Sequence, residues 1–325
     1  MLCICDKNKS LFDYFSHLTD SSQLAMSATH DFFSTLPSTI TSGLLDGQAS
    51  VEIVDASPRI VPIGYTPEYL IVRAARCSFG LGLKDPVTDA GLIKYMFRNS
   101  HTSPFEMVNV TLRLVIPKFV AIQFLRHRTA HINEFSQRYA EVPQGDTFYD
   151  PLKYKHGIRL QSKTNKQGSV LASENDQVVI RGLMAESNVH LKALHDLYHK
   201  MIEAGCSNEV ARSVLPISEY TTMYYQMDLN NLAKFLSLRV DFDHAQHETA
   251  VIATAILDLV RPLFPITIAC LEDRNGGLSL SATELEIVKS GLVPDGLKGS
   301  AKAELSKKLE RLLEAGVMVE REECV

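Results

Sequence analysis

The sequence contains no segment that would carry the chain into or across a membrane. No run of about 18 consecutive apolar residues occurs among its 325 residues. The first ten residues hold no basic stretch followed by an apolar stretch of signal-peptide length. The six cysteines are scattered, with no Cys-x-x-Cys pair and no disulfide-dense spacing, which is typical of a reducing compartment. We therefore expect a cytoplasmic protein with no membrane partner.

Two motifs that hold nucleotide phosphates are also missing. The sequence has neither a Gly-x-Gly-x-x-Gly fingerprint nor a P-loop, so any dinucleotide must be held without a Rossmann βαβ unit. A formal net charge of -5 provides no general basic field, and we expect no nucleic-acid partner. What the chain does have is 45% hydrophobic and 22% charged residues, a balance that allows a sizeable globular core.

The apolar pattern predicts a mixed α/β chain. Residues 108–116 alternate between apolar and mainly polar side chains, as in a strand with one buried face. Pro117 then suits the start of a helix, where its missing N–H is not needed. Further strands are expected at residues 51–54 and 69–72.

Helices are expected on both sides of this region. The ends of these helices are predicted from the helical period, from Gly205 as a C-terminal cap and from Pro262 as a helix stop. A polar stretch without periodicity, residues 152–178, predicts a surface loop. The predicted helices cover residues 11–18, 28–36, 88–99, 119–125, 177–204, 229–239, 243–259 and 301–315.

The densest group of polar and charged side chains lies at residues 126–139. We expect residues 133–139 to be extended, so that alternate side chains share one face of the strand. The face that would line a polar surface carries Glu134, Ser136 and Arg138.

Two arginines of this segment are expected to converge. Gln123 and Arg126 are three apart on the preceding helix and project the same way, which would bring Arg126 toward Arg138. Convergent guanidinium groups bind a phosphate or carboxylate through paired, charge-assisted hydrogen bonds. A solvated, salt-bridged turn is the alternative interpretation of the same residues.

The same segment resembles the signature of the flavin-dependent thymidylate synthases. It matches the pattern Arg-His-Arg-x-x-Ser-x-Asn-Glu-x-Ser-x-Arg-Tyr at every fixed position except His131, where the family usually has Ser. The resemblance covers roughly residues 50–272. Its further matching segments are residues 101–106, 211–216, 235–239 and 244–246.

The resemblance implies a fold and an assembly. It implies an α/β (α+β) catalytic domain over residues 51–272, with a curved, mainly antiparallel sheet flanked by helices, the thymidylate synthase-complementing protein fold, and no Rossmann unit. Residues 1–50 would then be an N-terminal extension and residues 273–325 a C-terminal helical extension. The assembly implied is a homotetramer with active sites shared between subunits.

The reaction implied is the reductive methylation of dUMP to dTMP. The resemblance implies 5,10-methylenetetrahydrofolate as the carbon donor and NADPH-reduced FAD as the cofactor. It also implies no enzymic cysteine nucleophile, and no cysteine here lies in a motif that would activate a thiolate. The protein's part would be to orient uracil C5 against the flavin and to supply fixed positive charge.

Carried over position by position, the resemblance assigns the ligand contacts. It places dUMP against Gln123, Arg126, Glu134, Ser136, Gln137, Arg138, Arg212 and Arg239. It places FAD against Ser103, Arg126, His127, Arg128, Glu134, Asp228, Asn230 and Lys234, with His101 near the flavin and the folate. Arg239 is the expected catalytic residue, because a fixed cation beside uracil favours the N3-deprotonated ring and polarises it for attack from C5.

Simpler interpretations exist for several of these residues. Arg239 stands at the end of a predicted helix, where a cation offsets the helix dipole. Asp228 and Asn230 are residue types that favour helix caps. His101 could be a turn histidine that hydrogen-bonds to the backbone.

Two alternative functions are a metal-dependent enzyme that uses the segment Asp241 to Glu248 and a non-catalytic nucleotide- or RNA-binding module. A metal ion could be ligated by His195 and His199, which stand four residues apart, or by a second group of acidic and histidine residues. That second group consists of Asp241, Asp243, His244, His247 and Glu248. Such spacing without a complete ligand set is unspecific, so we expect no metal. A non-catalytic nucleotide- or RNA-binding module would instead use Arg126, Arg128, Arg138 and the basic residues between 153 and 166.

Overall fold

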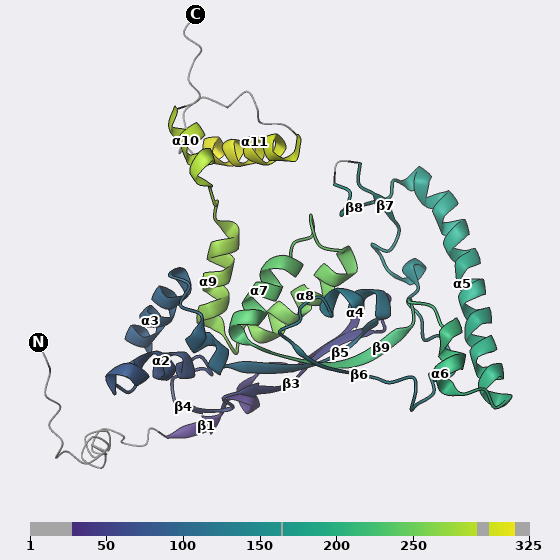
Figure 1. Ribbon diagram of the computed structural model, residues 1–325, viewed down its shortest axis with the longest axis horizontal. Helices are drawn as coiled ribbons and strands as arrows, with labels where there is room; N and C mark the ends of the chain where they lie inside the picture. The colour runs from purple at the N-terminus through teal and green to yellow at the C-terminus, as the bar shows by residue number, and fades with distance from the viewer. Residues whose placement is uncertain (1–27, 164, 291–298, 316–325) are drawn as a thin grey trace, which may run out of the picture. The chain divides into compact units, whose positions relative to one another are not determined.

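The computed structural model describes residues 28–163, 165–290 and 299–315 (Figure 1). The chain divides into two compact units, residues 1–270 and residues 271–325. Among the described residues, no helix has the length and apolar composition needed to cross a membrane.

The first unit is built on a five-stranded sheet in which every neighbouring pair of strands is antiparallel. The strand order is β2-β3-β5-β9-β6. The strands are β2 (Ile40–Leu44), β3 (Ala49–Ser57), β5 (Asn109–Pro117), β9 (Tyr220–Asp228) and β6 (His131–Glu134). The mainly antiparallel sheet expected from the sequence is confirmed.

One face of this sheet is buried and the other is open. Burial alternates along β3, β5 and β9, as it does when only one face of a sheet is covered. Leu112 and its partner Tyr225 lie on the buried face. Arg113 and its partner Tyr224 lie on the open face. Figure 1 shows the helices α7 and α8 covering the buried face.

The helices follow the periodic segments of the sequence. In the first unit they are α2 (Tyr69–Arg76), α3 (Pro86–Arg98), α4 (Lys118–Phe124), α5 (Glu174–Glu203), α6 (Asn208–Ala211), α7 (Leu229–Arg239) and α8 (His247–Val260). α9 (Pro265–Gly276) follows α8. Gly205 follows α5 with a φ of 87°, a backbone conformation that glycine adopts without steric cost.

Four predicted segments differ from the structure. Residues 69–72, predicted as a strand, begin α2, because a four-residue apolar run fits a buried helix turn equally well. Residues 28–36 form β1 (Thr29–Asp31) and the 3-10 helix η2 (Phe32–Thr35). Residues 152–178 are not a plain loop. They contain the 3-10 helix η5 (Pro151–Lys153), the hairpin β7 (Arg159–Gln161) and β8 (Ser169–Leu171), and the start of α5.

The fourth difference is at α8, which begins four residues later than expected. The Asp241 carboxylate accepts hydrogen bonds from the backbone N–H groups of Asp243 and His244. A side-chain oxygen that binds nearby backbone in this way favours a turn over a helix. The predicted helix at residues 11–18 lies outside the described residues.

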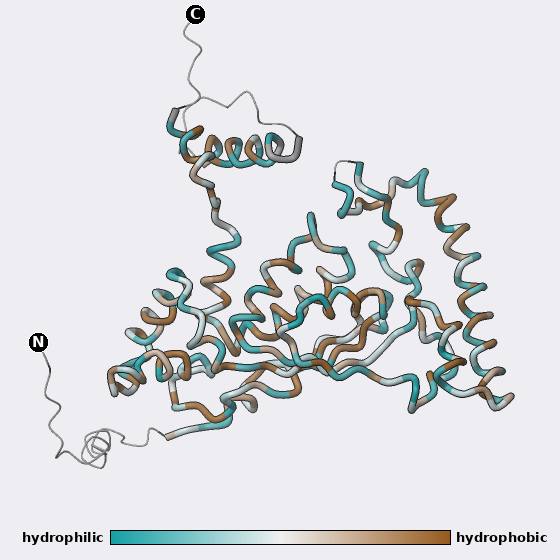
Figure 2. Tube along the Cα trace, viewed as in Figure 1, coloured by the Kyte–Doolittle hydropathy of each residue, from teal (hydrophilic) through white to brown (hydrophobic). Residues whose placement is uncertain are grey.

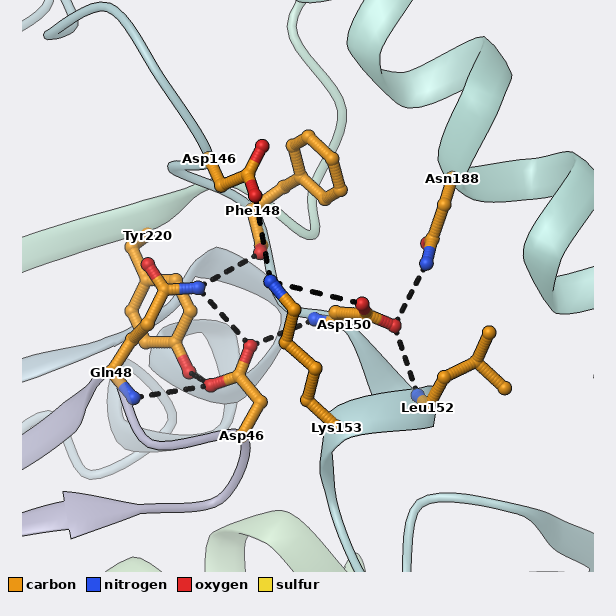
Figure 3. A network of polar contacts seen from close by, with 9 residues as sticks. All are labelled: Asp46, Gln48, Asp146, Phe148, Asp150, Leu152, Lys153, Asn188 and Tyr220. Atoms are coloured by element: carbon orange, nitrogen blue, oxygen red, sulfur yellow. Dashed lines mark hydrogen bonds and ion pairs between the residues drawn. The ribbon is translucent and has the colours of Figure 1, made fainter.

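A polar network ties the long helix α5 to the sheet (Figure 3). The Asp46 carboxylate, between β2 and β3, accepts hydrogen bonds from the Tyr220 hydroxyl at 2.6 Å and from the Asp150 backbone N–H at 2.8 Å. The Asp150 carboxylate in turn accepts from the Asn188 amide of α5 at 2.8 Å. Segments far apart in the sequence therefore meet at one end of the sheet.

The second unit contains α10 (Ala282–Ser290) and α11 (Gly299–Glu314). Figure 2 shows α11 alternating between hydrophobic and hydrophilic residues along its turns, as in an amphipathic helix. Ile287 and Leu305 are buried, and Lys308 pairs with Glu284 at 2.8 Å. The charged helix predicted near residues 301–315 is confirmed, whereas α10 was not expected.

Candidate active site

The polar segment at residues 126–139 lies at one edge of the sheet. It follows α4, forms β6 and pairs there with β9. After Glu134, the Phe135 N–H donates to the Thr222 carbonyl of the sheet at 2.8 Å. The chain then turns, and the Tyr139 N–H donates to the Ser136 carbonyl at 3.1 Å. The extended conformation expected for residues 133–139 is therefore wrong beyond residue 135.

This turn changes which side chains face inward. Gln137 is buried, and its amide oxygen accepts a hydrogen bond from the Lys118 ammonium. Arg138 points to solvent and pairs with Glu209 at 3.3 Å. The Arg126 side chain is exposed and forms no ion pair among the described residues, and the expected convergence of the two guanidinium groups stays a prediction.

Arg239 and His127 meet although they are distant in the sequence. Arg239 is the last residue of α7, and its Nε donates a hydrogen bond to Nε2 of His127 at 3.0 Å. Burial and the nearby guanidinium lower the pKa of His127, so its ring is neutral and accepts the hydrogen bond. The Phe235 ring lies edge-on to the imidazole, 4.9 Å away. Arg239, the expected catalytic residue, and His127, an expected flavin contact, are thus half-buried neighbours.

A second group of ionisable side chains lies under the turn. The Thr221 hydroxyl donates to the Glu134 carboxylate at 2.8 Å. Glu219 is fully buried, and neither of its carboxyl oxygens has a hydrogen-bond partner within the described residues. Burial raises its pKa to about 7, an effect that Thr147 and Lys118 partly offset. Glu219 belongs to the wall of a cavity of about 270 Å³.

Lys118 and Arg212 are the cations of this group. Lys118 begins α4, and burial lowers its ammonium pKa, while Glu134 and Glu219 act in the opposite direction. Arg212, half-buried in the 3-10 helix η6 (Arg212–Val214), is close enough to lower the same pKa. The fold therefore brings together three site residues expected from the sequence, Glu134, Gln137 and Arg212. They surround Lys118, which was not expected at the site.

The expected flavin residues come from three elements. Ser103 begins the 3-10 helix η4 (Ser103–Met107), which contacts the start of α7. There the Asn230 amide donates to Glu106 at 3.3 Å. Asp228 caps α7 by accepting the Asn231 N–H at 2.9 Å, so the simpler interpretation of this residue holds. His101 is exposed, and its backbone N–H donates to the Met96 carbonyl at 3.0 Å.

The remaining expected residues lie around this arrangement. Gln123 is half-buried on α4, and Ser136 accepts the Arg138 N–H through its hydroxyl at 3.4 Å. Three cations are exposed and form no ion pair among the described residues. These cations are Arg126, Arg128 and Lys234.

Three of the candidate metal-ligating histidines form hydrogen bonds with other side chains. His244 bonds to Asp241 at 2.6 Å, and His247 bonds to the Tyr154 hydroxyl at 2.9 Å. His195 bonds to the Thr147 hydroxyl at 3.0 Å. Within the described ranges, no group of three or more His, Cys, Asp or Glu side chains is placed to hold a metal ion.

Basic side chains of the region between 153 and 166 also have partners within the chain. Lys153 pairs with Asp146 at 3.4 Å, and Arg159 donates to the Ser169 hydroxyl at 2.7 Å. These contacts give the RNA-binding alternative no additional support.

Sequence reasoning missed Lys118 and Glu219. Lys118 carried a signal, because it is a charged residue among apolar neighbours between a predicted strand and a predicted helix, whereas Glu219 carried none. Such a residue is rarely buried without a partner. The signal could not show that the two residues meet, since they are about a hundred positions apart.

Comparison with known proteins shows that this chain is similar to enzymes. Residues 63–266 match the family described as thymidylate synthase complementing protein. A flavin-dependent thymidylate synthase of Dictyostelium discoideum is 40% identical over 245 residues, covering 74% of this chain and 77% of that protein. One of Treponema denticola is 38% identical over 246 residues, covering 74% and 89%.

A solved structure is also similar. It is a UMP/dUMP methylase, PolB from Streptomyces cacaoi, bound with 5-Br dUMP. The two chains are 28% identical with a TM-score of 0.57, over 73% of this chain and 97% of the methylase.

Proposed function

The chain belongs to the thymidylate synthase complementing family, whose relatives are flavin-dependent thymidylate synthases, and from this premise we propose that it methylates dUMP to dTMP with a reduced flavin. The observation that carries the proposal is the hydrogen bond between Arg239 and His127. It joins the cation expected at uracil to a residue expected at the flavin, and a methyl transfer to uracil needs both ligands in one place.

Arg239 is proposed to activate the uracil ring. Its guanidinium is half-buried and held by a neutral imidazole, which keeps the cation oriented without cancelling its charge. A fixed positive charge near uracil stabilises negative charge on the ring and makes C5 more nucleophilic. Partial burial strengthens this effect, because water screens the charge less.

The turn at residues 136–140 is proposed to hold the dUMP phosphate. The Gln137 backbone N–H donates to no partner within the described residues. The Ser136 hydroxyl and the exposed Arg138 guanidinium lie in the same turn. Backbone N–H, hydroxyl and guanidinium groups are the donors that phosphates prefer. Arg212, Gln123, Arg126 and Glu134 complete the proposed dUMP contacts.

FAD is the proposed cofactor, and the residues expected to bind it carry suitable donors. The exposed, unpaired cations Arg126, Arg128 and Lys234 suit its diphosphate, and Ser103, His127 and Asn230 offer further polar contacts. When bound, FAD supplies the reducing equivalents that come from NADPH. We propose 5,10-methylenetetrahydrofolate as the carbon donor, with the exposed His101 near both the flavin and the folate.

The proposed reaction needs no enzymic cysteine. Of the described cysteines, Cys77 is exposed after α2. Cys206 packs against the core cluster of Val142, Tyr198 and Ala211. We also propose that residues 51–272 are the catalytic domain and that residues 1–50 and 273–325 are extensions, although β2, within the first 50 residues, forms an edge of the catalytic sheet.

A homotetramer with shared active sites is the proposed assembly. The open face of the sheet and the exposed apolar residues of α5, such as Val179 and Val189, are surfaces that partners could cover.

The direct test is dTMP formation from dUMP by the purified protein with FAD, NADPH and 5,10-methylenetetrahydrofolate. We expect stoichiometric flavin, with absorption bands that shift when dUMP is added, and dTMP that requires all components. A protein that takes up no FAD and leaves dUMP unchanged would contradict the proposal.

Replacing the proposed activator provides a sharper test. Arg239→Ala is expected to lower the rate of dTMP formation by about 10²-fold or more, because a preorganised charge at the reacting ring is lost. Flavin content should stay near one per chain. Arg73→Ala, an exposed guanidinium on α2, is the control and should retain activity. Unchanged dTMP formation in Arg239→Ala would exclude this role.

A further inference from the structure

Lys118 occupies an unusual place for a lysine. It is the first residue of α4, and its backbone N–H donates to the Glu219 carbonyl at 2.9 Å. The next residue, Phe119, donates to the Ile217 carbonyl at 2.9 Å. These two bonds attach the start of α4 to the segment that leads into β9. The Lys118 side chain is therefore held between α4 and the edge of the sheet, partly out of water.

The Lys118 ammonium contacts one residue of the turn directly. It donates a hydrogen bond to the side-chain oxygen of Gln137, which is only 4% exposed. The Gln137 side-chain nitrogen has no partner among the described residues. The bond to Lys118 is thus the single hydrogen bond that holds this amide. Hydrogen bonds from a charged donor are stronger than neutral ones, and more so away from water.

The other contacts of the turn are weaker anchors. Arg138 and Glu209 are both more than half exposed, and exposed ion pairs contribute little and are screened by salt. The Asn208 amide reaches the Arg138 carbonyl at only 3.4 Å. Tyr139 is 83% exposed. Gln137 is therefore the buried residue through which the turn is attached to the rest of the domain.

Nearby carboxyl groups partly offset the lowering of the Lys118 pKa by burial. The carboxyl groups of Glu134 and Glu219 face it, and Arg212 is the opposing cation. Glu134 also accepts the Thr221 hydroxyl, whereas Glu219 has no hydrogen-bond partner of its own. Lys118 thus interacts electrostatically with the nearby carboxyl groups and forms a hydrogen bond with the turn.

We propose that Lys118 is a positioning residue for dUMP, which holds Gln137 and so fixes the turn at residues 136–140 in the conformation that binds the phosphate. This inference rests on the proposed function, since it assumes that dUMP binds at this turn. It assigns Lys118 no contact with the reacting atoms. Its loss should therefore weaken dUMP binding while leaving the chemical step at Arg239 intact.

The test replaces Lys118 with Met in the full-length, FAD-loaded protein. We expect the Kd of dUMP, measured by calorimetry, and its KM to rise about tenfold, which corresponds to about 1.4 kcal/mol. The kcat at saturating dUMP and the flavin content should stay within twofold of the wild type. Lys94→Met, the same change at an exposed position of α3, is the matched control. An unchanged Kd in Lys118→Met would overturn the inference.

A double-mutant cycle tests whether Lys118 acts through Gln137. If it does, the double variant Lys118→Met with Gln137→Leu should bind dUMP no more weakly than whichever of the two single variants has the higher Kd. Fully additive losses in Kd would show that Lys118 acts by another route and would overturn the positioning role.

One further variant separates positioning from folding. Lys118→Met leaves Glu219 buried without its counter-charge, which can prevent folding. Lys118→Met combined with Glu219→Leu removes both charges, and we expect a folded protein that still binds dUMP about tenfold more weakly. Wild-type affinity in this double variant would overturn the inference. Failure of the proposed function looks different, because the wild-type protein itself would then bind no dUMP.

Discussion

Glu219 is the residue whose ionisation depends most clearly on the fold. Its carboxyl group is fully buried, has no hydrogen-bond partner in the described chain, and faces the Lys118 ammonium and the Thr147 hydroxyl. Burial raises its pKa from about 4.5 to about 7. In that pH window the folded chain holds a proton that the unfolded chain has released. The free energy of unfolding therefore falls as the pH rises from about 4.5 to about 7.

Glu219→Gln should remove this dependence. The variant is expected to match the wild type near pH 4.5 and to be more stable at pH 8 by about 1 to 3 kcal/mol, since one pKa unit corresponds to about 1.4 kcal/mol. Chemical denaturation of both proteins at the two pH values measures the difference. A constant difference between the proteins at both pH values would show that Glu219 does not titrate in this range.

At the scale of single elements, α7 depends on the cap at its first turn. Asp228 accepts hydrogen bonds from the backbone and the side chain of Asn231. Asp228→Ala should lower the free energy of unfolding by about 1 kcal/mol, the usual cost of losing such a cap. Asp228→Asn keeps an accepting oxygen and should retain stability.

Flavin titration of the same two variants separates capping from cofactor binding. Because the Asp228 carboxylate is engaged by α7, we expect Asp228→Asn to bind FAD like the wild type. A variant of full stability that loses FAD affinity would instead show that the carboxylate serves the cofactor.

The turn between η5 and β7 depends on a glycine. A Cβ atom at Gly157 would lie 2.2 Å from the Pro151 carbonyl oxygen, closer than any nonbonded contact allows. Gly157→Ala should therefore destabilise the protein by about 1 to 3 kcal/mol through overpacking. Thermal unfolding measures the loss. Gly91→Ala is the control, because nothing lies within 4 Å of its added Cβ in α3, and alanine favours a helix. Equal melting temperatures for wild type and Gly157→Ala would contradict this account.

At the scale of the whole molecule, the proposed tetramer makes a measurable prediction. Light scattering should give a mass four times the 36.2 kDa of one chain. Tyr224→Lys places a charge on the open face of the sheet, where Tyr224 is 45% exposed. If this face is covered in the assembly, the variant should dissociate and lose dTMP formation together. Val87→Lys, at an 83% exposed position of α3, is the control. A Tyr224→Lys variant that dissociates but remains fully active would exclude shared sites.

Local patterns were enough to predict many elements of the fold. The alternation at residues 108–116 gave β5, and the helical period gave α3, α5 and α7. These signals come from neighbours in the chain, because periodicity reports which side of an element is buried. The same reasoning misassigned α2, since its short apolar run is compatible with either structure. It also missed the hairpin of β7 and β8, where two three-residue strands are too short to show a period.

The sequence by itself determined the family, part of the sheet, including β5, and the residue types of the site. Only the tertiary structure decided which of these residues meet. It turned the chain after Phe135, so that Gln137 rather than Arg138 faces inward. It also brought Arg239 to His127 and Lys118 to Gln137. The physical reason is that such contacts depend on how α4, α7 and β9 pack around one core, and no local pattern along the chain encodes that packing.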